Sequence, residues 1–316
     1  MKRVFLTGAN GCIGSATCRA LLDLGVDELV CFSRSGSSPE LYERTGQVRT
    51  VTGDMTDREG VISALKDADP THIIHLAAFQ TPDCNAYPLK GMAVNVDGTA
   101  NLIQAATQLD RLERMVIASS SAVYGKRAQY PGPTITTDDL LLPVNLYGYW
   151  KLANEGAAQA FQRQTGIPTV TVRLSTTYGP GRDKGYTAAP TTAMKHAVAG
   201  TPYRIPYTGR EHYHFVEDVG AGFAHACVEP FDGYTPINLR GLTTPVESFC
   251  DLIREQAKEL GLDADVGVAD DAEPIPFICD LDDRATLQRF PRMPLTPLAS
   301  GVRASLQCFM RASRCQ

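Results

Sequence analysis

Short apolar runs alternate with longer segments of mixed polarity through the first 175 residues. The apolar runs are a few residues long and predict strands over 4–6, 29–32, 48–51, 72–76, 115–118 and 169–172. The segments between them predict helices over 13–24, 58–66, 95–109 and 147–164. Because strands buried on both faces of a sheet read as continuous apolar runs, the alternation predicts βαβ units and a parallel sheet.

Beyond residue 175 the pattern changes. Glycine and proline become frequent between 179 and 209, and the alternation is lost, although 246–260 predicts an amphipathic helix and 291–316 a short helix after three prolines. We therefore predict an α/β fold, a Rossmann-type doubly wound parallel sheet with a smaller C-terminal substrate-binding region. The expected division is a dinucleotide-binding domain over 1–175, with 212–240 returning to it, and a substrate-binding region over 176–211 and 241–316.

Composition narrows the functional classes. The 316 residues are 43% hydrophobic and 21% charged, which is typical of a globular protein. A net charge of -5 gives no basic footprint for nucleic acid, and no apolar run approaches the roughly 20 residues of a membrane span. The nine cysteines form no C-x-x-C pair, so no metal site or disulfide framework is predicted. We expect a cytoplasmic protein that binds neither nucleic acid nor membranes.

The first predicted strand ends in a glycine-rich loop, Thr7-Gly8-Ala9-Asn10-Gly11-Cys12-Ile13-Gly14, where a helix begins. Glycines at 8, 11 and 14 let the backbone turn tightly and approach a pyrophosphate, which the free N–H groups of the helix would then face. A glycine triplet alone is also compatible with a plain turn. Its place between a strand and a helix favours dinucleotide binding.

The second predicted strand ends in Ser33-Arg34-Ser35, without the carboxylate that would hold the ribose 2′-hydroxyl of NAD. Arg34 beside Ser33 could instead meet the 2′-phosphate of NADP. The alternative is that Arg34 is a solvated loop residue. The expected cofactor is NADP or NAD, with a preference for NADP.

Tyr147 and Lys151 are four residues apart, so on a helix their side chains share a face. A lysine ammonium near a phenol favours the phenolate, and we expect it to lower the pKa of Tyr147 from about 10 towards neutrality. Such a tyrosine can give or take a proton at a carbonyl or alcohol. Ser120 follows the strand 115–118, where open α/β sheets bind ligands; a serine capping a turn is the alternative.

Taken in sequence order, the motifs resemble the extended short-chain dehydrogenase/reductases of the NAD-dependent epimerase/dehydratase family. Besides the glycine loop, the resemblance rests on Gly53-Asp54-Met55, His75-Leu76-Ala77-Ala78, Asn95-Val96-Asp97-Gly98-Thr99, Ser120 to Gly125, Tyr147 to Lys151 and Tyr178-Gly179-Pro180-Gly181. It implies that Tyr147 is the catalytic acid/base. It also implies that Lys151 binds the nicotinamide ribose and tunes Tyr147, and that Ser120 polarises the substrate oxygen.

The motifs and the resemblance together give a set of expected binding residues. The cofactor set is Gly8, Asn10, Gly11, Cys12, Ile13, Gly14, Ser33, Arg34, Asp54, Met55, Leu76, Ala77, Ala78, Asn95, Tyr147 and Lys151. The substrate set is Phe79, Ser121, Thr176 and His214. The family often dimerises through two long helices of each subunit, so we expect a homodimer through the helices that start at Asn95 and Tyr147.

The sequence departs from the family pattern at several positions. Ser121-Ala122 stands where dehydratases of the family carry Asp-Glu, which disfavours dehydration. Glu211 stands where members that use nucleotide sugars carry an arginine, and a carboxylate facing a diphosphate would repel it. Arg210 could substitute with a shift in register. Thr176 and Trp150 replace the usual Asn and Ser, which alters the pocket.

The leading hypothesis is an NAD(P)-dependent oxidoreductase that transfers a hydride between a nicotinamide cofactor and a hydroxyl or keto carbon of a small polar substrate. That substrate would be sugar-like or a hydroxy acid. The alternative is an NAD-dependent sugar epimerase that retains its cofactor. A remote alternative is a non-catalytic regulator that senses the dinucleotide, but such a protein would need none of Ser120, Tyr147 and Lys151.

Overall fold

A large parallel sheet forms the centre of the computed structural model, which describes residues 1–35, 46–274 and 278–314. Within these residues the sheet has seven strands in the order β10-β6-β5-β4-β1-β2-β3, and every neighbouring pair is parallel. The strands are β1 (Arg3–Thr7), β2 (Glu28–Ser33), β3 (Val48–Thr52), β4 (His72–His75), β5 (Arg114–Ser120), β6 (Thr169–Leu174) and β10 (Tyr234–Asn238).

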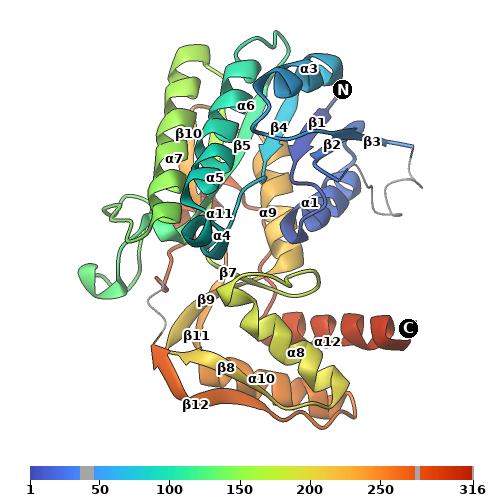
Figure 1. The fold of residues 1–316 in the computed structure, drawn as a ribbon, viewed down its shortest axis with the longest axis vertical. Helices are drawn as coiled ribbons and strands as arrows, with labels where there is room; N and C mark the ends of the chain where they lie inside the picture. The colour runs from blue at the N-terminus through green and yellow to red at the C-terminus, as the bar shows by residue number, and fades with distance from the viewer. Residues whose placement is uncertain (36–45, 275–277, 315–316) are drawn as a thin grey trace.

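Helices cover both faces of this sheet (Figure 1). One face carries α1 (Cys12–Asp23) and α9 (Val216–Val228), and the other carries α3 (Arg58–Ala68), α6 (Gly98–Ala106) and α7 (Leu146–Thr165). Successive residues of β1 point to opposite faces of the sheet. Val4 and Leu6 pack in the core under α1 and α9, and Phe5 packs in the core under α3, α6 and α7. The predicted Rossmann-type doubly wound sheet is confirmed.

A smaller region lies beside the carboxyl ends of the strands, at the bottom of Figure 1. It contains a three-stranded sheet in the order β11-β9-β7 and a two-stranded parallel sheet of β12 and β8. These strands are β7 (Thr176–Tyr178), β8 (Tyr203–Thr208), β9 (Arg210–Phe215), β11 (Leu242–Pro245) and β12 (Val266–Pro274). The helices packed with them are α8 (Ala189–Ala199), α10 (Val246–Glu259) and α12 (Leu298–Arg314). None of the helices in the described ranges combines the length and apolar character of a membrane span.

The structure differs from the predicted elements mainly outside the regular βαβ units. Two short helices that were not predicted, α4 (Thr81–Ala86) and α5 (Pro88–Met92), follow β4. The helix predicted over 95–109 is a π-helical turn over Ala93–Asp97 followed by α6. The C-terminal helix α12 has 17 residues and is not short. Phe290 and Met293, from the predicted substrate-binding region, pack in the core under α1 and α9. The division of the chain into two regions stays a prediction.

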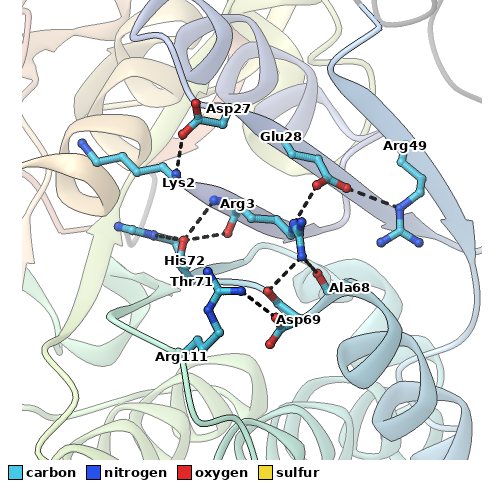
Figure 2. A network of polar contacts seen from close by, with 10 residues as sticks. All are labelled: Lys2, Arg3, Asp27, Glu28, Arg49, Ala68, Asp69, Thr71, His72 and Arg111. Atoms are coloured by element: carbon cyan, nitrogen blue, oxygen red, sulfur yellow. Dashed lines mark hydrogen bonds and ion pairs between the residues drawn. The ribbon is translucent and has the colours of Figure 1, made fainter.

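Arg3 fastens β1 to its neighbours at the amino ends of the strands (Figure 2). Its Nε donates to Glu28 Oε2 at 2.6 Å, and its Nη1 donates to the carbonyl oxygen of Ala68 at 3.1 Å. Its backbone N–H donates to Thr71 Oγ1 at 2.9 Å. These contacts join β1, β2, the end of α3 and the start of β4. They stabilise the sheet at the end opposite the carboxyl ends, where α/β folds place their ligands.

Helix α7 is fixed to the sheet by a buried ion pair. Glu155 and Arg173 are 5% and 2% exposed, and Arg173 Nη2 donates to Glu155 Oε2 at 2.7 Å while its Nε donates to Oε1 at 2.9 Å. Ser119 Oγ on β5 donates to Glu155 Oε1 at 2.5 Å, and Arg173 Nη1 donates to the hydroxyl of Tyr124 at 2.8 Å. The network therefore joins α7 to β5 and β6.

We predict that Arg173→Met lowers the free energy of unfolding by about 3–5 kcal/mol, because it leaves the Glu155 carboxylate buried without its cation. Glu155→Met should have a similar effect for the converse reason. The double variant should lose much less than the sum, because neither charge is then left unpaired. Urea denaturation of the four proteins measures this coupling. Additive losses would show that the pair does not act as a unit.

Candidate active site

A cavity of about 980 Å³ lies along the carboxyl ends of the parallel strands. Residues that follow β1 to β6 line it, as expected for the ligand site of an open α/β sheet. The lining includes most of the residues predicted from the sequence: Gly8, Asn10, Gly11, Cys12, Ile13, Gly14, Ser33, Arg34, Asp54, Met55, Leu76, Ala77, Ala78, Phe79, Ser120, Ser121, Tyr147, Lys151 and Thr176. Asn95 and His214 are not among them.

The glycine loop has the geometry of a dinucleotide cradle. Gly8 has φ +74°, and a Cβ there would lie 2.9 Å from the backbone nitrogen of Ala77. A Cβ on Gly14 would overlap the carbonyl oxygen of Gly8. The first turn of α1 carries no acidic residue, and its N-cap, Gly11, offers no side chain to the free N–H groups. These groups fit an anion such as a pyrophosphate.

Asn10 links this loop to the end of β2. Its Nδ2 donates to Ser33 Oγ at 2.9 Å and to Ser35 Oγ at 2.8 Å. Its Oδ1 is buried without a hydrogen-bond partner among the described residues, which leaves an acceptor for a ligand at the cavity. Arg34 is exposed, and its Cζ lies 5.9 Å from the ring centroid of Phe79. The guanidinium therefore sits at the rim of the cavity.

Ser120, Tyr147 and Lys151 come together at one end of the cavity. Ser120 is the last residue of β5, and Tyr147 and Lys151 lie one turn apart at the start of α7. Lys151 is 4% exposed; its Nζ donates to the carbonyl oxygen of Ala118 at 2.8 Å and lies 5.6 Å from the Tyr147 ring centroid. The Ser120 hydroxyl accepts the N–H of Ala122 at 3.1 Å.

The pKa of Tyr147 differs from the expectation. Burial raises it to about 12, although a hydrogen bond with Ser120 and the charge of Arg182 both lower it. Burial lowers the pKa of Lys151 to about 8. The expected lowering by Lys151 is not seen in this structure, because burial dominates and the ammonium is bonded to the carbonyl oxygen of Ala118. A phenol with this pKa is protonated at neutral pH.

Asn95 and His214 support the cavity from outside its lining. Asn95 is 1% exposed; its Oδ1 accepts the N–H of Phe79 at 2.7 Å, and its Nδ2 donates to the Phe79 carbonyl oxygen at 3.0 Å. His214 is 1% exposed; its Nε2 accepts the N–H of Ser175 at 2.9 Å, and its Nδ1 donates to the Arg240 carbonyl oxygen at 2.7 Å. Contrary to the sequence expectation, both side chains bond to backbone groups and neither lines the described part of the cavity.

Glu211 also lies away from the cavity. It is fully buried, its Oε1 accepts from Thr176 Oγ1 at 3.0 Å, and burial raises its pKa to about 7. Arg210 forms two hydrogen bonds with Asp280, at 2.8 and 3.0 Å. Neither Glu211 nor Arg210 lines the described part of the cavity, so the structure does not place the Glu211 carboxylate directly against a ligand there.

Arg182 lines the cavity but was missed from the sequence. It directly follows the motif Tyr178-Gly179-Pro180-Gly181, and its charge acts on the pKa of Tyr147. Its place one residue beyond a recognised motif was the available signal. An arginine in a glycine-rich loop is usually solvated, so nothing in the local sequence distinguishes one that faces a cavity.

Comparisons with known proteins agree with this geometry. A family profile described as the NAD dependent epimerase/dehydratase family matches residues 4–239. An uncharacterized protein of Methanocaldococcus jannaschii is 28% identical over 78% of this chain and 77% of its own length. The D-erythronate dehydrogenase of Cupriavidus necator is 31% identical over 55% of this chain and 54% of its own. The match thus spans only about half of the second relative.

A solved structure extends the similarity to the whole chain. The UDP-glucose 4-epimerase of Thermus thermophilus, in complex with NAD, has a TM-score of 0.82 and 25% identity, and the match covers 97% of this chain and 98% of that one. Two predictions are confirmed: the chain is an enzyme of the extended short-chain dehydrogenase/reductase type, and its chemistry is NAD(P)-dependent oxidoreduction. The chain belongs to the NAD-dependent epimerase/dehydratase family.

Proposed function

We propose that the chain is an oxidoreductase that exchanges NADP or NAD and transfers a hydride to or from a hydroxyl or keto carbon of a small polar substrate. The observation that carries this proposal is the arrangement of the cavity. Ser120, Tyr147 and Lys151 meet at one end, and the glycine loop of Gly8 to Gly14 lies along the same cavity. A regulator that only senses the dinucleotide would have no use for the first group.

The residues that would hold the dinucleotide are those of the glycine loop, the ends of β2 to β4, Tyr147 and Lys151. When bound, the nicotinamide ring supplies hydride acceptance or donation at the substrate carbon. Tyr147, protonated at neutral pH, donates its proton to a substrate carbonyl oxygen as negative charge develops there. In the opposite direction the alcohol proton passes to the Tyr147 phenolate, so Tyr147 must first give up its own proton to solvent, and oxidation should be favoured at alkaline pH. Ser120 donates a hydrogen bond to the same substrate oxygen.

We also propose that the protein binds NADP more tightly than NAD. Arg34 lies at the cavity rim directly after β2, and Asp54 is the acidic side chain among the described residues of the lining. The Asp54 carboxylate accepts from the N–H and Oγ1 of Thr56, both at 2.9 Å, and this lowers its pKa. With no carboxylate at the end of β2, the 2′ position of a bound ribose would meet the Arg34 guanidinium, which supports a preference for the 2′-phosphate of NADP.

A sugar epimerase that retains NAD is the second candidate. The UDP-glucose 4-epimerase of T. thermophilus supports it, since its fold matches nearly the whole chain. The D-erythronate dehydrogenase of C. necator, named for a sugar acid, supports net oxidoreduction. The two candidates differ in what happens to the cofactor. An epimerase oxidises and re-reduces the same carbon with no net change in reduced nicotinamide, whereas an oxidoreductase releases its cofactor in the changed redox state.

We also propose that the protein is a cytoplasmic homodimer. Exposed apolar side chains gather on α5 and at the start of α7, which pack together where Gly91 meets Trp150. They include Leu89 and Met92 on α5 and Leu146 and Tyr149 on α7. Such a patch favours a protein interface. The described cysteines are all free, which suits the reducing conditions of the cytoplasm.

We predict that Tyr147→Phe lowers kcat by at least about 100-fold, because the proton donor is lost, while affinity for NADP stays within about twofold. The rate is followed by the absorbance of reduced nicotinamide with a substrate found by screening sugars and hydroxy acids. Tyr203→Phe, a tyrosine of β8 outside the described cavity lining, is the matched control and should keep full activity. A Tyr147→Phe variant that keeps its rate would refute the catalytic assignment.

We predict that Arg34→Ala weakens NADP binding by about tenfold or more and leaves NAD binding nearly unchanged, because only NADP carries the phosphate that the guanidinium would meet. Fluorescence titration with each reduced cofactor measures both affinities. Arg49→Ala removes an equivalent charge from β3, where Arg49 faces Glu28, and should change neither affinity. Equal losses for the two cofactors in Arg34→Ala would remove the preference.

A further inference from the structure

Arg182 is a half-buried cation that lines the cavity. It lies between β7 and α8, and its Nη2 donates to Thr187 Oγ1 at 2.9 Å. Both residues line the cavity. The Nε of Arg182 is buried and has no hydrogen-bond partner among the described residues. Leaving a buried donor without an acceptor is unfavourable, more so when the group is charged, so a bound ligand that accepts from this N–H would stabilise the site.

The charge of Arg182 is also uncompensated within the described chain. Its neighbour Asp183 forms an ion pair with Lys195 instead. The groups whose charges act on Arg182 are Cys12, Tyr147 and Tyr207, and none of them is a carboxylate; burial lowers the pKa of Arg182.

Two fully buried arginines donate to more acceptors through their side chains than Arg182 does, although the Nε of Arg114 also has no partner among the described residues. Arg173 donates to both oxygens of the Glu155 carboxylate. Arg114 donates to the carbonyl oxygens of Ala226, Glu229 and Phe231 at 2.8–3.1 Å. Arg182 differs from both, because it lines the cavity and the hydroxyl of Thr187 is the one acceptor of its side chain among the described residues.

An anion for Arg182 has two possible sources, the cofactor pyrophosphate and the substrate. The glycine loop and the first turn of α1 already offer N–H groups for a pyrophosphate. Arg182 lies near enough to Tyr147 for its charge to lower the pKa of that phenol, so it stands at the reacting end. Its bonding partner Thr187 belongs to the segment before α8, on the side of the smaller region. These observations favour the substrate as the source.

We propose that Arg182, assisted by Thr187, binds a carboxylate of the substrate, and that the substrate class is therefore the hydroxy acids and sugar acids. A guanidinium can bond both oxygens of a carboxylate in one plane, which fixes the position of the neighbouring hydroxyl-bearing carbon relative to Tyr147. This inference rests on the proposed function, since it names the substrate of the same site. It adds a specificity residue that the sequence motifs did not contain.

Isothermal titration of the full chain in the presence of NADPH tests the proposal, because hydroxy acids cannot react with the reduced cofactor. The probes are glycerate, erythronate and gluconate, each paired with the alditol of the same carbon skeleton: glycerol, erythritol and glucitol. We expect at least one acid to bind the wild type at least about 30-fold more tightly than its alditol. Arg182→Gln should abolish this difference and leave NADPH affinity within about twofold.

Two further variants control the result. Arg182→Lys keeps the charge but not the planar pair of donors, so acid affinity should fall between the wild type and Arg182→Gln. Arg289→Gln removes an exposed arginine of α11 (Arg284–Arg289) with the same change in net charge and should bind acids like the wild type. If no acid binds better than its alditol, or if Arg182→Gln weakens NADPH as much as the acids, the proposal is wrong.

Turnover with NADP and NAD separates this proposal from the proposed function. If the acids bind through Arg182 but neither cofactor is reduced, the oxidoreductase assignment fails and the carboxylate site stands. If the alditols are oxidised as efficiently as the acids in a reaction that Tyr147→Phe abolishes, the oxidoreductase assignment stands and the role of Arg182 fails.

Discussion

The buried ion pair of Glu155 and Arg173 sets the position of the helix on which the proposed chemistry depends. Glu155 lies one turn beyond Lys151 on α7, so both side chains point at β5. Lys151 donates to the carbonyl oxygen of Ala118, and Glu155 accepts from Ser119, the two residues before Ser120. These adjacent contacts hold Tyr147 and Ser120 in register at the end of one strand, and Arg173 adds the neighbouring strand to the same unit.

Desolvation governs the charge state of the site built on that helix. Burial raises the pKa of Tyr147 to about 12, and the two opposing influences are the Ser120 hydroxyl and the Arg182 charge. A carboxylate bound to Arg182 would offset that charge and so favour the protonated phenol. Since Tyr147 is already protonated at neutral pH, the substrate would not change which form is present but would raise the pKa further. Binding and proton transfer are linked through one guanidinium in this arrangement.

The sequence predicted the features that depend on local pattern. The glycine loop, the spacing of Tyr147 and Lys151 and the apolar strands are set by neighbouring residues, and the structure has them where expected. Helix α9 was missed because nine of its thirteen residues are buried, so it shows no amphipathic stripe. The positions of Asn95 and His214, and the pKa of Tyr147, depend on burial by distant segments. Local sequence carries no measure of that burial.

The most direct test of the central claim is native mass spectrometry and near-ultraviolet absorbance of the purified protein, followed by titration with NADP and NAD. An exchanging oxidoreductase with Arg34 at its cofactor rim should purify with an empty site and bind NADP more tightly than NAD. Tightly retained NAD that does not exchange would contradict this account. That result would identify the protein as an epimerase and show that Arg34 does not bind a 2′-phosphate.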